Sequence, residues 1–146
     1  FHLGNSMCVL AGLLFGGVPG GLAAGIGTAI VELIDPLWAP EFWVSFINKF
    51  IMGFVAGTIA TLGGTRTTSK NIIAAICGAF SYVLLYIGKS YLQQVALGST
   101  KEAIVTVLTT KAITSCINAV VAIIVSVALY HLIAPALKKA NLFQKK

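Results

Sequence analysis

Four polar side chains interrupt the apolar segments of this sequence, where an ammonium or an amide group is unusual. They are Lys49, Lys89, Lys111 and Asn118. An ionisable side chain is costly within a membrane and therefore usually faces a cavity or a partner. Near the end of a segment a lysine can instead extend to the lipid headgroups, and this alternative stays open for Lys89 and Lys111. Lys49 lies deeper, beside Asn48, and is the stronger candidate for a functional role.

Helical spacing places further polar residues on the same faces. One face carries two phenols, an amine and an amide at i, i+4, i+7 and i+11: Tyr82, Tyr86, Lys89 and Gln93. A second face carries Lys111, Ser115 and Asn118 at i, i+4 and i+7. Aromatic walls stack on a flat ring, while amide and amine groups hydrogen-bond its edges. The two faces predict a small pocket, although the tyrosines are equally typical of membrane interfaces and Asn118 could simply bridge two helices.

Two residues near the start of the chain, His2 and Asn5, are expected at the mouth of this pocket. Catalytic features are missing from the sequence. It contains no phosphate-binding loop, no HExxH or GxSxG motif, and no cluster of acids that would hold Mg²⁺. We therefore expect no enzymatic activity, no metal and no cofactor. If the protein moves a solute, the energy is expected to come from another subunit.

The composition indicates what must position these residues. Hydrophobic residues make up 58% of the 146 residues and charged residues only 10%, whereas about a quarter of the residues in a soluble domain are charged. We predict an all-α, polytopic membrane helix bundle that forms one transmembrane domain over residues 1–146. Its expected spans are 5–15, 20–34, 42–62, 71–92 and 103–137, followed by a tail over 138–146.

The last three segments are long enough to cross a hydrocarbon core of about 30 Å. The first two are shorter, and they predict either a re-entrant hairpin or, as we favour, two short or tilted spans. Their connection is expected at the glycine- and proline-rich residues 16–20.

Charge predicts the orientation of the bundle. The four acids lie at one set of segment ends: Glu32, Asp35, Glu41 and Glu102. Basic residues lie at the other ends: Arg66, Lys70, Lys138, Lys139, Lys145 and Lys146. Short loops rich in Lys and Arg stay in the cytoplasm, so the C-terminus is expected inside and Phe1 outside. One further span upstream is expected, which makes six spans in all. Because the basic residues are divided between two regions of the sequence, we expect no nucleic-acid partner.

Small residues indicate how the helices pack. Gly17, Gly21 and Gly25 recur at every fourth position of the second segment, and Gly53 and Gly57 do so in the third. This spacing lets helix backbones approach closely. It favours packing within the chain, and docking to another membrane subunit is the alternative.

Several runs in the first 60 residues resemble one family. They are HLGN at 2–5, LAGLLFG at 10–16, GGLAAGIGTA at 20–29, FINKF at 46–50 and GFVAG at 53–57. Together they resemble the substrate-binding S components of energy-coupling factor (ECF) vitamin transporters. The rest of the chain is similar mainly in helix layout and in an asparagine on the last helix.

The resemblance implies a six-helix bundle in a bacterial cell membrane that binds a vitamin near the outer face. It also implies association with a transmembrane coupling subunit and two ATP-binding subunits, whose ATP hydrolysis would drive toppling of the S component. By region it assigns pocket roles to His2, Asn5, Lys49, Tyr82, Tyr86, Lys89 and Asn118. The family's first helix, which carries a docking motif for the coupling subunit, has no counterpart here, so that surface stays unassigned.

Within the family the sequence looks most like the branch for hydroxymethylpyrimidine or pyridoxine, and less like the riboflavin and pantothenate branches. Aromatic walls suit a pyrimidine or pyridine ring, while the lysines would also suit a carboxylate such as that of pantothenate. Two other classes stay open: a non-transporting membrane scaffold subunit and a stand-alone channel or facilitator.

Overall fold

The computed structural model describes residues 3–37, 39–64 and 66–140, and this part of the chain is almost entirely helical. Its elements are α1 (Gly4–Phe15), α2 (Gly17–Ile34), the short 3₁₀ helix η1 (Ala39–Glu41), α3 (Phe42–Thr61), α4 (Thr68–Ala96) and α5 (Lys101–Lys139). Four helical stretches are long and apolar enough to cross a membrane: α2, η1 with α3, α4, and α5. The prediction of an all-α polytopic membrane bundle is confirmed.

The connection between α1 and α2 is tighter than the expected turn over 16–20. Only Gly16 leaves the helical conformation, with φ of 86°, a left-handed backbone that glycine adopts without steric cost. Pro19 then falls in the first turn of α2, where the missing N–H removes no intrahelical hydrogen bond. The second helix therefore begins at Gly17, three residues earlier than expected.

The last two helices are longer than expected, and the ends of α5 are stabilised locally. The hydroxyl of Thr100 accepts a hydrogen bond from the Ala103 amide, which caps the start of α5. Glu102 lies in the first turn of α5, and Lys138 and Lys139 lie in its last turn, where each sign of charge complements the helix dipole.

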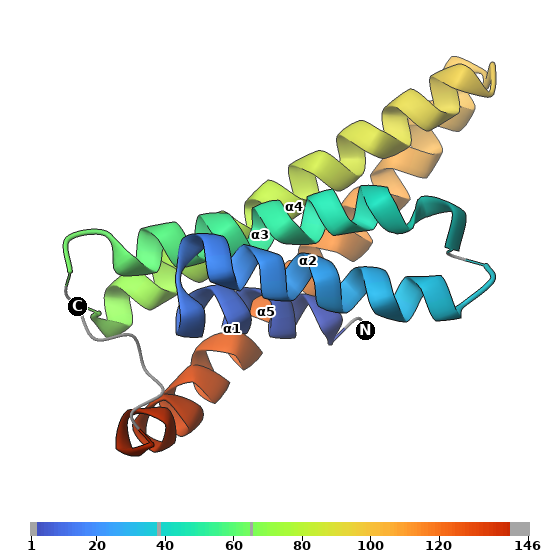
Figure 1. Ribbon diagram of the computed structural model, residues 1–146. Coiled ribbons are helices and arrows are strands. Elements are labelled where there is room, and N and C mark those ends of the chain that lie inside the picture. The colour runs from blue at the N-terminus through green and yellow to red at the C-terminus, as the bar shows by residue number, and fades with distance from the viewer. Residues whose placement is uncertain (1–2, 38, 65, 141–146) are drawn as a thin grey trace.

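The helices form two groups (Figure 1). α1, α2 and α3 lie side by side, and α3 contacts α1, α2 and α4. α4 and α5 run antiparallel, and their connected ends project beyond the other helices (Figure 1). Because α5 also packs on α1, the two groups close around a shared interior.

Small residues fill that interior. Buried side chains at the helix contacts include Ala56, Ala74 and Ala122. A methyl group added at Gly21 would lie 2.9 Å from the carbonyl oxygen of Phe50, and one added at Gly57 would lie 2.2 Å from the carbonyl carbon of Gly16. Five glycines were singled out in the sequence, and all of them lie where α3 contacts α2 or Gly16, the residue before α2. They are Gly17, Gly21, Gly25, Gly53 and Gly57. The structure thus uses them for packing within the chain.

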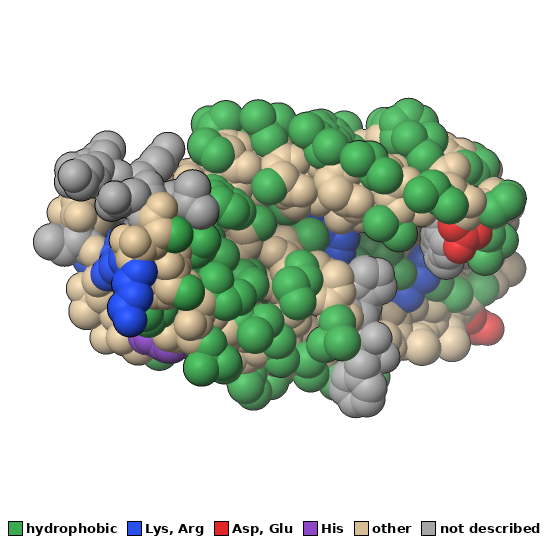
Figure 2. All heavy atoms as spheres, turned by 60° about the horizontal axis from the view of Figure 1, so that its bottom comes forward, with side chains coloured by type: hydrophobic (Ala, Val, Ile, Leu, Met, Phe, Trp, Pro, Cys, Tyr) green, Lys and Arg blue, Asp and Glu red, His purple; other side chains and the backbone are tan. Residues whose placement is uncertain are grey.

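The surface is apolar around the middle and charged at the ends (Figure 2). Many hydrophobic side chains cover this face. Lys or Arg and His side chains gather at one end and the Asp or Glu side chains at the other, with further Lys or Arg side chains in the hollow that leads toward the acids. Exposed large apolar residues include Ile34, Ile124 and Leu132, each more than half exposed. Such a belt is expected of a multi-pass membrane protein, whose solvent in this zone is lipid.

Candidate functional site

Two adjoining cavities lie toward the acidic end of the molecule. The first, which we call the charged cavity, has a volume of about 280 Å³ and lies between α2, α3 and α4. Its lining consists of Val31, Glu32, Asp35, Glu41, Ser45, Asn48, Lys49, Tyr82, Tyr86 and Lys89. The second, the hydroxyl cavity, has a volume of about 210 Å³ and is lined by Asn5, Tyr82, Tyr86, Thr110, Lys111, Thr114, Ser115 and Asn118.

The wall shared by the two cavities is a pair of tyrosines one turn apart on α4. The rings of Tyr82 and Tyr86 are stacked, with centroids 5.8 Å apart and planes inclined by 16°. The Lys49 ammonium lies 4.1 Å from the centroid of the Tyr82 ring, and the Lys111 ammonium lies 5.4 Å from that of Tyr86. Each ring therefore already has a lysine ammonium near it, at a distance typical of cation–π contacts.

Lys49 is buried at the point where three helices meet. Its side chain, on α3, donates a hydrogen bond to Oδ1 of Asn5 on α1 and lies over the Tyr82 ring of α4. Only 5% of Lys49 and 2% of Asn5 are exposed. The amide of Asn5 and the ring of Tyr82 are both neutral, and a buried charge is stabilised best by an opposite charge or by several acceptors. The site is thus suited to a ligand that brings acceptor atoms or negative charge to Lys49.

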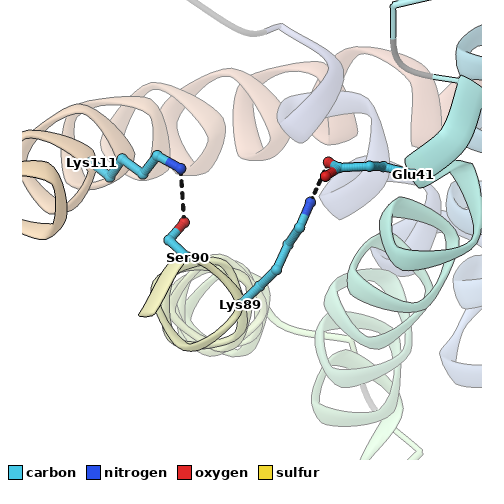
Figure 3. Close-up of polar contacts among 4 residues, drawn as sticks. All are labelled: Glu41, Lys89, Ser90 and Lys111. Atoms are coloured by element: carbon cyan, nitrogen blue, oxygen red, sulfur yellow. Dashed lines mark hydrogen bonds and ion pairs between the residues drawn. The ribbon is translucent and has the colours of Figure 1, made fainter. Parts of the chain in front are cut away.

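Two polar bridges flank α4 (Figure 3). Lys89 reaches from α4 to Glu41 at the end of η1, with Nζ and Oε2 2.5 Å apart, and this ion pair lies at the lining of the charged cavity. Lys111 reaches from α5 to the hydroxyl of Ser90 on α4, at 3.1 Å. The side chains of Lys89 and Ser90 leave α4 in different directions, so the two bridges tie α4 to η1 and to α5 separately.

The structure brings together nine of the ten candidate residues of the pocket. Asn48, Lys49 and Lys89 line the charged cavity; Asn5, Lys111, Ser115 and Asn118 line the hydroxyl cavity; and Tyr82 and Tyr86 line both. His2 lies outside the described residues. Gln93, which shares the helical face of the tyrosines, is exposed and lines neither cavity. The binding roles of all these residues stay predictions.

Sequence reasoning missed the acids of the charged cavity. Glu32, Asp35 and Glu41 were expected only at the ends of segments, yet all three line the cavity. Oε2 of Glu32 is buried without a hydrogen-bond partner in the described structure. One signal was available, because Glu32 is the only acid inside any of the five apolar segments. Among the described residues, no group of three His, Cys, Asp or Glu side chains is placed to hold a metal ion.

Comparison with known proteins gives one match. The sequence profile of a family described as "ECF-type riboflavin transporter, S component" matches residues 1–135, which is most of the chain. No curated protein and no solved structure matches this sequence.

Proposed function

The chain belongs to the family of ECF-type transporter S components, and on that premise we propose that it captures a small vitamin or vitamin precursor in the charged and hydroxyl cavities. The observation that carries the proposal is the tyrosine wall of Tyr82 and Tyr86, which is flanked on both sides by buried polar groups. A ring that enters either cavity meets an aromatic face and hydrogen-bonding side chains at its edges.

The preferred ligands are hydroxymethylpyrimidine and pyridoxine. Each is a single substituted aromatic ring, a size suited to cavities of about 210 and 280 Å³. Their ring nitrogens and hydroxyl oxygens are acceptors for Lys49. Their amino or hydroxyl groups are donors for the buried Glu32 oxygen that has no partner.

Riboflavin is the second candidate, because the matched family is described by it. Its three fused rings and ribityl chain are much larger than one pyrimidine. We expect it to bind only if Tyr82 and Tyr86 move so that the two cavities join. A pantothenate-type ligand, whose carboxylate would pair with Lys49, is the remaining alternative.

Calorimetric titration of the purified protein with these four compounds tests the proposal. We expect submicromolar binding of hydroxymethylpyrimidine or pyridoxine. Tyr82→Phe keeps the ring and should keep the affinity, whereas Tyr82→Leu and Asn118→Ala should each weaken it by about tenfold or more. Gln93→Ala, on the same helical face but outside both cavities, is the matched control. Absence of binding to all four compounds would refute the proposal.

We also propose that the protein works with a transmembrane coupling subunit and two ATP-binding subunits, with its C-terminus in the cytoplasm. Family membership and the lack of a nucleotide-binding motif support this arrangement. Uptake of the bound vitamin into liposomes should then require the partner subunits and ATP. Flux through the protein alone would indicate a channel, and partner assembly without any ligand binding would indicate a scaffold.

A further inference from the structure

A third cavity lies at the opposite end of the molecule, between the start of α4 and the last turns of α5. Its volume is about 280 Å³, and we call it the basic cavity. It is lined by Arg66, Thr68, Asn71, Tyr130, His131, Ala134, Pro135 and Lys138. None of these residues lines the charged or the hydroxyl cavity, so the proposed vitamin site leaves this feature unexplained.

The electrostatic surroundings of the basic cavity are positive. Arg66, His131 and Lys138 line it, and Lys139 follows in the same last turn of α5. All four acids of the chain lie away from this end, near the end of α2, in the α2–α3 connection or in the first turn of α5. In Figure 2 the end that carries His together with Lys or Arg shows no acidic side chain, and the visible acids lie at the other end. The first turn of α4, which begins at Thr68, adds the positive end of a helix dipole.

One buried polar group in the cavity lacks a partner. Asn71 is 1% exposed, and its Oδ1 atom makes no hydrogen bond in the described structure. A buried amide oxygen without a partner is destabilising, so a ligand that brings a hydroxyl donor to it gains affinity from that contact. If the amide turns over, its NH₂ donates to an anionic oxygen instead. Tyr130, which is 6% exposed, places a second polar group among the buried part of the lining.

The position of the cavity relative to the apolar belt narrows the ligand class. It lies at the ends of two helices that are long and apolar enough to span a membrane, and the ends of such helices are expected near the lipid headgroups. Leu132, next to His131 on α5, is 74% exposed and offers an apolar surface for an acyl chain. Basic pockets between spanning helices are typical sites for anionic headgroups. We propose that the basic cavity binds a phosphate group, supplied by the headgroup of an anionic phospholipid.

Arg66 links this ligand to the packing of the bundle. Its guanidinium donates to the carbonyl oxygens of Leu13 and, at 3.2 Å, of Leu14, which are among the last of α1. A phosphate held by the same cavity therefore contacts residues of α4 and α5 and an arginine that is anchored on α1. Binding should stabilise the contact between the two helix groups without touching the vitamin site.

The test measures lipid binding to the full chain by native mass spectrometry and by thermal unfolding in detergent. Phosphatidylglycerol is the probe, phosphatidylcholine is the zwitterionic control, and glycerol 3-phosphate supplies the same phosphate chemistry in soluble form. Lys138→Gln removes an exposed charge that lines the cavity. Lys139→Gln, the adjacent residue of the same turn, removes an exposed charge that does not. We expect Lys138→Gln to weaken phosphatidylglycerol binding about fivefold, the effect of one basic residue near an anionic headgroup, and Lys139→Gln to have little effect.

Each outcome decides the proposal. Selective retention of phosphatidylglycerol that is sensitive to Lys138 but not to Lys139 supports a lipid site. If glycerol 3-phosphate stabilises the protein as much as phosphatidylglycerol does, the basic cavity binds phosphate, but its ligand is a soluble anion and the lipid assignment is wrong. If both variants lose binding equally, or if phosphatidylglycerol binds no better than phosphatidylcholine, the basic cavity is not a site. Vitamin affinity measured on Lys138→Gln should equal that of the unaltered protein, so this result stands apart from the proposed transport function.

Discussion

At the scale of single residues, Lys49 and Asn5 decide whether the interior is built for stability or for a ligand. The ammonium of Lys49 is almost fully buried, and its hydrogen-bond partner is the neutral amide of Asn5. A core selected for stability alone gains more from apolar side chains of the same volume than from such a pair. A buried Lys49–Asn5 pair is physically reasonable if a bound ligand supplies the further acceptor atoms or the negative charge that the ammonium needs.

A double-mutant cycle on this pair tests that interpretation. Asn5→Leu leaves the ammonium buried without its acceptor and should lower the free energy of unfolding by about 2 kcal/mol. Adding Lys49→Met removes both polar partners together, and the double variant should recover most of that loss. Chemical or thermal unfolding in detergent measures the four corners of the cycle.

Ligand titration of the same variants separates the two roles. The double variant should fold well and bind the vitamin at least tenfold more weakly, because the ammonium is absent. A double variant with the affinity of the unaltered protein would show that Lys49 serves only packing.

At the scale of helices, most of the architecture is predictable from the sequence because apolar length and glycine spacing are local properties. Helical periodicity alone predicts one face with Tyr82 and Lys89 and a second face with Lys111 and Asn118. In the structure both faces line the cavities. Two features were not predictable in this way. The one-residue turn at Gly16 depends on how closely α1 and α2 pack, and the position of Glu32 depends on how α2 is rotated against α3.

The contact between α2 and α3 yields a prediction with a built-in control. An alanine methyl at Gly57 would lie 2.2 Å from the backbone of Gly16, so Gly57→Ala must push the helices apart. We expect a loss of about 1–3 kcal/mol, typical of overpacking. Gly88→Ala adds the same methyl group at an exposed position within α4, where it would meet no atom of another part of the chain within 4 Å, and should be neutral or stabilising.

Unfolding midpoints of the two variants, measured side by side in one detergent, provide the comparison. Similar midpoints for Gly57→Ala and Gly88→Ala would contradict the close packing of α2 on α3. A destabilised Gly57→Ala that still binds the vitamin would place this contact in the scaffold rather than in the site.

At the scale of the whole molecule, the candidate vitamin site and the basic cavity lie toward opposite ends. The charged and hydroxyl cavities lie toward the acidic end, and the basic cavity lies at the other. At the acidic end Lys89 pairs with Glu41, whereas Arg66 and Lys138 line the cavity at the other end. This asymmetry is a property of the assembled fold, because residues far apart in the sequence create each end.

The asymmetry predicts a single orientation in the membrane. Short basic segments stay in the cytoplasm, so Lys139 should face inside, and Thr100, at the connected ends of α4 and α5, should face outside. In a variant whose native cysteines are replaced by alanine, Thr100→Cys should react with a membrane-impermeant maleimide in intact cells. Lys139→Cys should react only after the membrane is permeabilised. The reverse pattern would place the vitamin cavities on the cytoplasmic side, where an importer could not capture its ligand.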